Sequence, residues 1–331
     1  MKALLSRTPG GPETLQLEEV PDPHAGRGQL LIAIKACGVN FPDLLTIQDR
    51  YQVKAPRPFA PGAEIAGVVS AVGEGVAGFA AGDRVIGRCG TGGMAGMIAL
   101  EADRCAKIPA AMPFTDAAAF QFTYATGYFA LETRGRLRAG ETVLVLGAAG
   151  GVGLAAIQIA KALGARVIAA ASSEQKIAFA RQHGADDGLV YPVQLDAEAE
   201  QRAFSGRLKA VLGPGGADVV VDPVGGPLTE VALRNTARGG RFLILGFTAG
   251  IASVPMNVPL LKSCDILGID WRVFLLTHPE VNAANLDALF AMYERGEVVP
   301  IITETFPLAR GAEAIARLQG RSAMGKIVVT M

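Results

Sequence analysis

Residues that commonly bind metals or form disulfides are scarce in this sequence. It has three histidines and four cysteines among 331 residues. The cysteines are far apart and form no CxxC pair, which is typical of reduced thiols and argues against a disulfide scaffold. They are Cys37, Cys89, Cys105 and Cys264. The histidines are interpreted as surface or loop residues. They are His24, His183 and His278.

The chain also lacks net charge and long apolar runs. Its 31 basic and 31 acidic residues give a formal net charge of zero, so we expect no basic surface and no nucleic-acid partner. No apolar run is long enough to span a bilayer, and the apolar part of the N-terminal MKALLSRTPGGPE is too short for a signal peptide. We therefore expect a cytoplasmic protein that does not bind membranes.

Apolar residues, in contrast, are abundant. Half of the residues are hydrophobic and only 19% are charged, which allows a large core and argues against disorder. A chain of 331 residues most often folds as two domains.

One stretch, Glu141 to Ser173, organises the chain. Residues 142–147 form an apolar run rich in β-branched residues, which predicts a buried parallel strand. A glycine-rich turn, a helix over 154–163 and a second buried strand over 166–171 complete a βαβ unit. Glycines at the first turn let the backbone approach a pyrophosphate at the helix N-terminus, although they could also serve only tight packing. The residues expected to bind a dinucleotide here are Ala149, Gly150, Gly151, Val152 and Gly153.

The end of the second strand indicates which dinucleotide binds. An NAD enzyme usually has an acidic residue there for the ribose 2′-hydroxyl. Here Ser172, Ser173 and Lys176 occur instead, and two hydroxyls with a cation suit a 2′-phosphate, so we predict NADPH. Glu174 is better explained as a first-turn residue of a helix capped by Ser173. Lys176 could also be an ordinary solvated helix residue.

The remaining pattern predicts two kinds of domain. Residues 1 to about 120 are expected to be mostly β, with a short helix over 41–48. Strands then alternate with helices, which predicts a doubly wound parallel sheet. Its predicted strands are 142–147, 166–171, 188–191, 218–222, 241–246 and 265–271. Two helices, 279–295 and 307–319, precede a last strand over 326–330, which we expect to return to the first domain.

Several motifs along the chain carry a family resemblance. They are Gly38-Val39-Asn40-Phe41-Pro42-Asp43, Pro61-Gly62-Ala63-Glu64-Ile65-Ala66-Gly67, Gly82-Asp83-Arg84-Val85, Thr126-Gly127-Tyr128, the glycine turn, Val221-Asp222-Pro223-Val224-Gly225 and Gly325-Lys326-Ile327-Val328. With them the whole chain resembles the medium-chain dehydrogenase/reductase superfamily, and most of all its zinc-free quinone oxidoreductases related to zeta-crystallin. Ala148 stands where many dinucleotide folds have their first glycine, as it does in this branch.

The resemblance implies a Rossmann doubly wound sheet plus a GroES-like, mostly β catalytic domain. The GroES-like domain would comprise residues 1–122, completed by 273–331, and the Rossmann NADPH-binding domain 123–272. The related alcohol dehydrogenases bind zinc through three residues. By resemblance, Asn40 stands at the position of the cysteine ligand, Ala63 at that of the histidine ligand, and the third position falls near Phe122. Glu64 remains, but one carboxylate alone cannot hold the metal. We therefore expect no zinc. Without that Lewis acid the expected substrate is already electrophilic: a quinone or another α,β-unsaturated carbonyl.

Three residues are the candidates for catalysis. The resemblance places Asn40 beside nicotinamide and substrate, and Asn40 is also a good helix N-cap. Tyr51 follows the short helix and resembles the catalytic tyrosine of related enoyl thioester reductases; it would donate to the developing oxygen charge, or only pack in its loop. Asp43 is expected to support the pocket through a buried hydrogen bond.

Further residues are expected at the cofactor or the substrate. Thr126 resembles a nicotinamide-side threonine, and Gly246 and Phe247 follow a parallel strand at its ligand-binding edge. Tyr191 and Arg321 resemble positions that hold the 2′-phosphate, although Arg321 could be a lone arginine in a polar turn. Two residues at the end of the last predicted nucleotide-domain strand are expected to line the substrate cleft, although the tryptophan could equally belong to the core. They are Trp271 and Arg272.

Two other functions stay open at this point. An enoyl thioester reductase would need a basic channel, which Arg50, Lys54 and Arg57 could supply. A non-catalytic NADPH-binding protein is the other alternative, against which Asn40, Tyr51 and Thr126 argue. The resemblance also predicts a homodimer, formed through the edge strand near residues 265–271.

Overall fold

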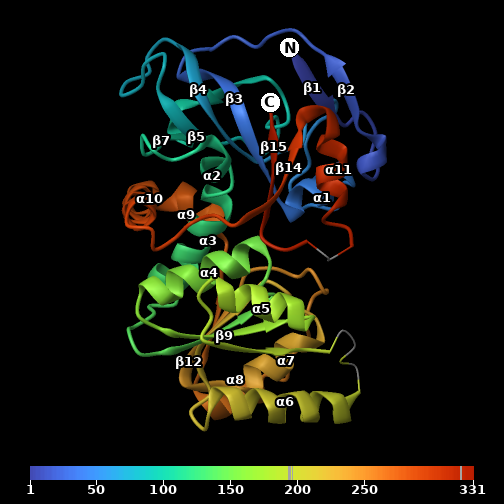
Figure 1. The fold of residues 1–331 in the computed structure, drawn as a ribbon, viewed down its shortest axis with the longest axis vertical. Helices are drawn as coiled ribbons and strands as arrows, with labels where there is room; N and C mark the ends of the chain where they lie inside the picture. The colour runs from blue at the N-terminus through green and yellow to red at the C-terminus, as the bar shows by residue number, and fades with distance from the viewer. Residues whose placement is uncertain (193–194, 196, 321–322) are drawn as a thin grey trace. The chain divides into compact units, whose positions relative to one another are not determined.

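The computed structural model describes residues 1–192, 195, 197–320 and 323–331. These residues form two compact units (Figure 1). One unit comprises Met1–Phe122 together with Pro300–Met331, and the other comprises Thr123–Val299. The second unit thus extends beyond residue 272, where the sequence analysis ended it.

The core of the second unit is a parallel sheet in the order β10-β9-β8-β11-β12-β13. Its strands are β8 (Thr142–Leu146), β9 (Arg166–Ala171), β10 (Asp187–Val190), β11 (Ala217–Asp222), β12 (Thr236–Ile244) and β13 (Asp265–Gly268). The strands after β8 continue first to one side and then to the other, so the direction of winding reverses at β8. Ligands bind at the carboxyl ends of the strands at such a reversal, and this is where the glycine-rich turn lies.

Helices cover both faces of this sheet, which confirms the predicted doubly wound fold. In Figure 1, α4 and α5 lie on one side of the sheet, and α6, α7 and α8 lie on the other. The helices are α3 (Thr126–Tyr128), α4 (Gly151–Ala162), α5 (Glu174–Gln182), α6 (Glu198–Leu212), α7 (Pro227–Arg234), α8 (Asn257–Lys262), α9 (Trp271–Thr277) and α10 (Pro279–Glu294). The segment leading into the unit adds two π-helical stretches, Gln121–Ala125 and Phe129–Arg134, on either side of α3.

The end of the last parallel strand differs from the prediction. The strand predicted over 265–271 stops at Gly268, and Trp271 begins helix α9. The cause is local, because the Asp270 side chain accepts a hydrogen bond from the Val273 amide at 3.0 Å and caps the helix. The Trp271 indole is buried and donates to Asn282 Oδ1 at 2.9 Å, so α9 and α10 belong to the second unit.

The first unit is built on a mostly antiparallel sheet in the order β14-β15-β3-β4-β5-β7, with β6 also paired to β3. The strands are β1 (Lys2–Leu5), β2 (Gln16–Glu19), β3 (Gln29–Val39), β4 (Glu64–Val72), β5 (Arg84–Arg88), β6 (Met97–Glu101), β7 (Cys105–Lys107), β14 (Ile302–Pro307) and β15 (Lys326–Thr330). Its helices are α1 (Phe41–Ile47), α2 (Phe114–Ala118) and α11 (Gly311–Ala316), with 3-10 turns at Pro12–Thr14, Ala102–Arg104 and Leu308–Arg310. The helix predicted over 307–319 is shorter in the structure, where α11 ends at Ala316.

The C-terminal strand completes this unit, as predicted. β15 pairs antiparallel with β3, so Val328 and Val329 lie opposite Gly38 and Cys37. Because residues 326–329 are buried, β15 contributes to the core of the first unit. Within the described part of the chain, no helix has the length and apolar character that a membrane span requires.

Gly153 allows helix α4 to lie close to the glycine-rich turn. A Cβ at this position would lie 2.4 Å from Gly147 O and 2.9 Å from Ala148 Cα, both backbone atoms. We predict that Gly153→Ala lowers the free energy of unfolding by about 1–3 kcal/mol, because the helix must move away. The free energy is measured from the urea midpoint and slope.

The matched control is Gly206→Ala in the exposed middle of α6, where no heavy atom lies within 4 Å of the added Cβ. Here we expect a gain of about 0.5–1 kcal/mol, because alanine is the better helix former. Equal urea midpoints for Gly153→Ala and wild type would contradict the packing argument.

Candidate functional site

The glycine-rich turn presents backbone N–H groups at the start of a helix. Gly147 has a left-handed φ of 60°, and the Gly150 amide donates to Gly147 O at 3.0 Å to close the turn. Gly150 is the N-cap of α4 but has no side chain to occupy the first amides, and the first turn of α4 has no acidic residue. The positive end of a twelve-residue helix therefore lies at the carboxyl edge of the sheet, where it suits a phosphate group.

A cation and a hydroxyl lie together where β9 ends. Lys176 Nζ donates to Ser172 Oγ at 3.2 Å, and burial lowers the pKa of the Lys176 ammonium. Ser173 is the N-cap of α5, as predicted, and its Oγ accepts from the Lys176 amide at 3.3 Å. The half-buried Tyr191 lies beside this strand end, because its amide donates to Ala171 O at 2.9 Å. Arg321 lies outside the described residues.

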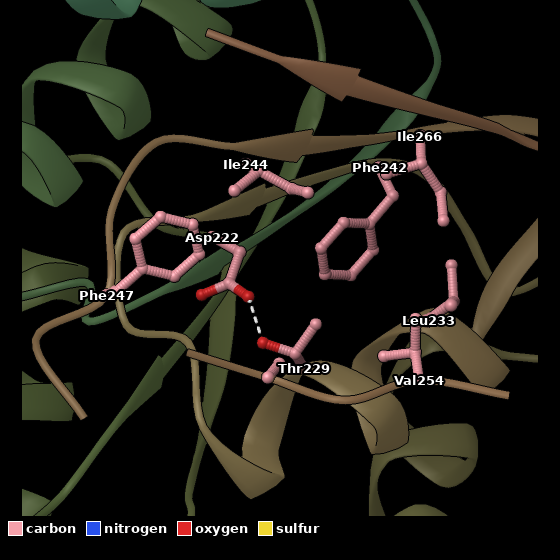
Figure 2. A pocket seen from close by; sticks show the side chains of 9 residues that line it. Asp222, Thr229, Leu233, Phe242, Ile244, Phe247, Val254 and Ile266 are labelled. Atoms are coloured by element: carbon pink, nitrogen blue, oxygen red, sulfur yellow. Dashed lines mark hydrogen bonds between the residues drawn. The ribbon is translucent and has the colours of Figure 1, made fainter. Parts of the chain in front are cut away.

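A small cavity is lined by one of the other predicted cofactor residues, Phe247. Gly246 and Phe247 follow β12, and Phe247 lines a cavity of about 70 Å³ together with Asp222 and apolar side chains (Figure 2). Both Asp222 oxygens are used: one accepts from the Val224 and Gly225 amides at 2.8 Å, and the other from Thr229 Oγ1 at 2.6 Å. Burial raises the pKa of Asp222 while these bonds oppose it. Asp222 therefore holds the turn after β11, which gives the Val-Asp-Pro-Val-Gly motif its physical reason.

In the first unit, a buried lysine binds two of the residues that the motifs singled out. Lys326 is 4% exposed, and its Nζ donates to Asn40 Oδ1 at 2.7 Å and to Glu64 Oε1 at 2.9 Å. A third bond goes to Val39 O at 3.1 Å. Asn40 Nδ2 also donates to Glu64 Oε1, at 2.9 Å. The carboxamide thus lies between an ammonium and a carboxylate; we name Asn40, Asp43, Glu64 and Lys326 the buried polar cluster.

Lys326 was not among the candidates from the sequence. A lysine that opens an otherwise apolar terminal strand, Lys-Ile-Val-Val, is the signal that could have found it. The other Glu64 oxygen accepts from the Phe122 amide at 2.8 Å, so both oxygens of this carboxylate are engaged. No three histidine, cysteine or acidic residues gather into a metal-binding group among the residues described.

Asp43 fixes the backbone of the buried polar cluster at Asn40 and the neighbouring backbone at Gly62. It is 2% exposed, and its carboxylate accepts from the Asn40 amide at 2.7 Å and from the Gly62 amide at 3.2 Å. Burial raises the pKa of Asp43 from 3.8 to about 7, although the two amides and the charge of Lys326 oppose the rise. The buried hydrogen bonds are of the kind that the sequence analysis expected of Asp43.

The segment around Tyr51 is held by an ion pair. Tyr51 is half-buried in the loop after α1. Arg57 Nη1 pairs with Asp49 Oδ1 at 2.7 Å, and its Nη2 donates to Ile47 O at 2.9 Å. Because Arg57 is committed to these contacts, it anchors the loop and is a poor candidate for the basic channel considered above; Arg50 and Lys54 are exposed.

The remaining predicted residues lie in the second unit. Thr126 is half-buried at the start of α3, which follows a π-helical stretch, so the helix is irregular there. Arg272 is exposed and forms an ion pair with Asp270, with 3.7 Å between Nη2 and Oδ2. Trp271 packs in the core of this unit with its N–H bonded to Asn282, which matches the core alternative.

Comparison with known proteins gives matches along almost the whole chain. The family profile described as alcohol dehydrogenase GroES-like domain matches residues 26–110, and that of zinc-binding dehydrogenase matches residues 151–286. Quinone oxidoreductase-like protein 2 of Bos taurus is 36% identical over 319 residues, which cover 96% of this chain and 89% of that protein.

Solved structures agree with these matches. The Escherichia coli quinone oxidoreductase complexed with NADPH superimposes with a TM-score of 0.90 at 29% identity, covering 100% of both chains. The Thermus thermophilus quinone oxidoreductase, solved also with NADPH, gives a TM-score of 0.85 at 33% identity, again covering 100% of both chains.

The raised pKa of Asp43 predicts a pH-dependent stability. Between its ordinary value of 3.8 and about 7, the folded protein holds the proton and the unfolded chain does not. The contribution of Asp43 to the free energy of unfolding therefore falls as the pH rises through this window, by up to ~1.4 kcal/mol per pH unit. Asp43→Asn removes the titrating group. The difference in the free energy of unfolding between wild type and variant should therefore change with pH, as measured by urea unfolding at pH 5, 6, 7 and 8.

Asp287→Asn, which changes an exposed carboxyl on α10, is the control and should leave the pH profile unchanged. Parallel stability profiles for wild type and Asp43→Asn would show that Asp43 holds no proton in this range.

Proposed function

This chain belongs to the medium-chain dehydrogenase/reductase superfamily, in its quinone oxidoreductase-like branch, and on that premise we propose that it is an NADPH-dependent reductase of quinones or other α,β-unsaturated carbonyls. The family and the GroES-like and Rossmann fold predicted from the motifs are confirmed by these matches. The observation that carries the proposal is the end of β9, where Lys176 and Ser172 replace the acid that would bind a ribose 2′-hydroxyl.

Bound NADPH would supply a hydride, and the protein would supply orientation and hydrogen bonds. The N–H groups at the start of α4 would hold the pyrophosphate, and Ser172 with Lys176 the 2′-phosphate. Tyr191 and Arg321 are proposed beside that phosphate, and Gly246 and Phe247 along the cofactor. Thr126 is proposed at the nicotinamide.

The proposed reduction is independent of zinc. At the positions that would hold zinc in the related alcohol dehydrogenases, the one carboxylate, Glu64, binds the ammonium of Lys326 and the Phe122 amide. The substrate must therefore carry its own electrophilic carbon. Asn40 and Tyr51 are proposed to donate hydrogen bonds to the oxygen on which charge develops, and Tyr51 to supply the proton that an enone needs at its α-carbon. Asp43 would hold the backbone of Asn40 in place through the hydrogen bond that it accepts from the Asn40 amide.

A homodimer is part of the proposal. β13 is the last strand in the order of the parallel sheet, and an unpaired edge favours pairing with a second copy. Large apolar side chains of the same unit are strongly exposed: Ile251 at 85%, Leu260 at 78% and Met256 at 72%. Exposed apolar side chains of this size also favour association with a second copy.

The cofactor assignment predicts a selective effect of Lys176→Ala. Loss of a charge-assisted contact to the 2′-phosphate should raise the KM for NADPH by about 10- to 100-fold, while the KM for NADH, which lacks this phosphate, changes less than about 2-fold. Initial rates followed by nicotinamide absorbance give both values. Lys209→Ala, an exposed lysine on α6, should change neither, and an equal rise for both cofactors would contradict the assignment.

The substrate class is tested by NADPH oxidation against an ortho-quinone, a simple enone and crotonyl-CoA in parallel. We expect turnover of the quinone or the enone and little of the thioester. Tyr51→Phe in the same assay should slow enone reduction by about 10²-fold or more, and quinone reduction much less, because water can protonate a hydroquinone oxygen.

Preference for crotonyl-CoA would overturn the substrate class and favour an enoyl thioester reductase. Tight NADPH binding without turnover of any acceptor would favour a non-catalytic NADPH-binding protein. Equal rates of Tyr51→Phe and wild type with all acceptors would leave Tyr51 as a packing residue.

A further inference from the structure

The buried polar cluster contains more contacts than an ion pair requires. Lys326 and Glu64 are 4% and 2% exposed, and a charge at such depth is costly unless it is paired. The Lys326–Glu64 contact at 2.9 Å meets that need. The shortest bond of the ammonium, however, goes to the neutral oxygen Asn40 Oδ1, at 2.7 Å.

Two opposite charges determine which way the carboxamide of Asn40 points. Oδ1 faces the Lys326 ammonium, and Nδ2 faces Glu64 Oε1 at 2.9 Å. The reversed amide would place its N–H groups against the ammonium and its oxygen against the carboxylate, and both contacts would be repulsive. The ion pair therefore selects one orientation of Asn40.

The selected orientation holds one Nδ2 hydrogen in a weak bond that a ligand would have to replace. One Nδ2 hydrogen is donated to Glu64 Oε1 at 2.9 Å, and the other is donated to Gly38 O in a long bond of 3.4 Å. The ammonium withdraws charge through Oδ1, which makes the Nδ2 hydrogens stronger donors. The backbone is held as well, because the Asn40 amide donates to Asp43 at 2.7 Å.

We propose that Lys326 is a positioning residue of the reductase: it holds the carboxamide of Asn40 so that Nδ2–H is offered to the substrate oxygen. The proposal rests on the proposed function for its chemical consequence. Its geometric part, that Lys326 determines the orientation of Asn40, stands independently of the substrate.

A purely structural role of Lys326 makes a different prediction. If the ammonium only neutralises Glu64, removing both charges together should restore stability and activity alike. If it positions Asn40, removing both charges restores stability but not turnover. The test therefore compares Lys326→Met with the double variant Lys326→Met, Glu64→Gln, which removes the unpaired charge that the single variant leaves on Glu64.

We expect the single variant to have a lower urea midpoint and the double variant to recover most of it. In the double variant, kcat for the best acceptor should fall about 10- to 100-fold, the usual effect of losing an outer contact that orients a functional residue. The Kd for NADPH should stay within about 2-fold. A double variant with a recovered midpoint and wild-type kcat would overturn the proposal.

A second comparison asks whether Lys326 acts through Asn40. In an Asn40→Ala background, the same double substitution should lower kcat no further, because the group it positions is already absent. Additive losses would overturn the proposal. Lys209→Met, the same substitution at an exposed lysine, is the control for expression and handling and should match wild type.

The orientation of Asn40 is also measured without turnover. In protein labelled with 15N only at asparagine, the side-chain amide pair of Asn40 is the pair that is absent from Asn40→Ala. We expect this pair to shift in the double variant, whereas an unchanged position would overturn the proposal. If wild type reduces no acceptor, the proposed function fails, and this spectrum still decides the geometric part. Should the double variant not fold, Lys326→Gln with Glu64→Gln replaces it.

Discussion

The first unit depends on the hydrogen bonds that one buried ammonium donates to the oxygen atoms around it. Lys326 comes from the C-terminal strand, and its partners come from β3, β4 and the N-cap of α1. The same Glu64 that pairs with it also accepts the amide of Phe122. Because each of these groups would be costly to bury alone, their burial requires that residues separated by more than 250 positions come together. The last strand buries its apolar residues 327–329 in the first unit, and these bonds allow Lys326 to be buried with them.

The candidate site in the second unit consists mainly of backbone N–H groups, whereas the cluster in the first unit consists of charged and polar side chains. The central strands β8, β9 and β11 of the second unit are mostly apolar and buried, and the features that suit a dinucleotide are N–H groups at the start of α4 and small residues at the turn. The end of β9 adds a charged side chain, Lys176, which is bonded to Ser172. This division fits the proposed function, in which N–H groups of the second unit would hold phosphate groups of NADPH.

Local patterns predicted the elements of the fold well where the pattern itself determines the structure. The βαβ unit around the glycine turn, the cap at Ser173 and the terminal strand were all readable, because burial, glycine and capping act within a few residues. The prediction of a strand over 265–271 was wrong at its end. Asp270 followed by an apolar run is a helix-capping signal that the sequence already contains. The length of the second unit was missed because it depends on contacts such as Trp271 with Asn282, which apolar periodicity does not reveal.

The sequence by itself determined the alternation of strands and helices, the position of the glycine turn and the absence of an acid after β9, because each is a property of neighbouring residues. Its motifs also led to the family that the comparisons then confirmed. Only the tertiary structure decided what Lys326 does. Periodicity assigns it to a strand, but whether a lysine in a strand is solvated or buried depends on which oxygens the fold brings within hydrogen-bond distance. Here those oxygens belong to Val39, Asn40 and Glu64, which lie far from it in the chain.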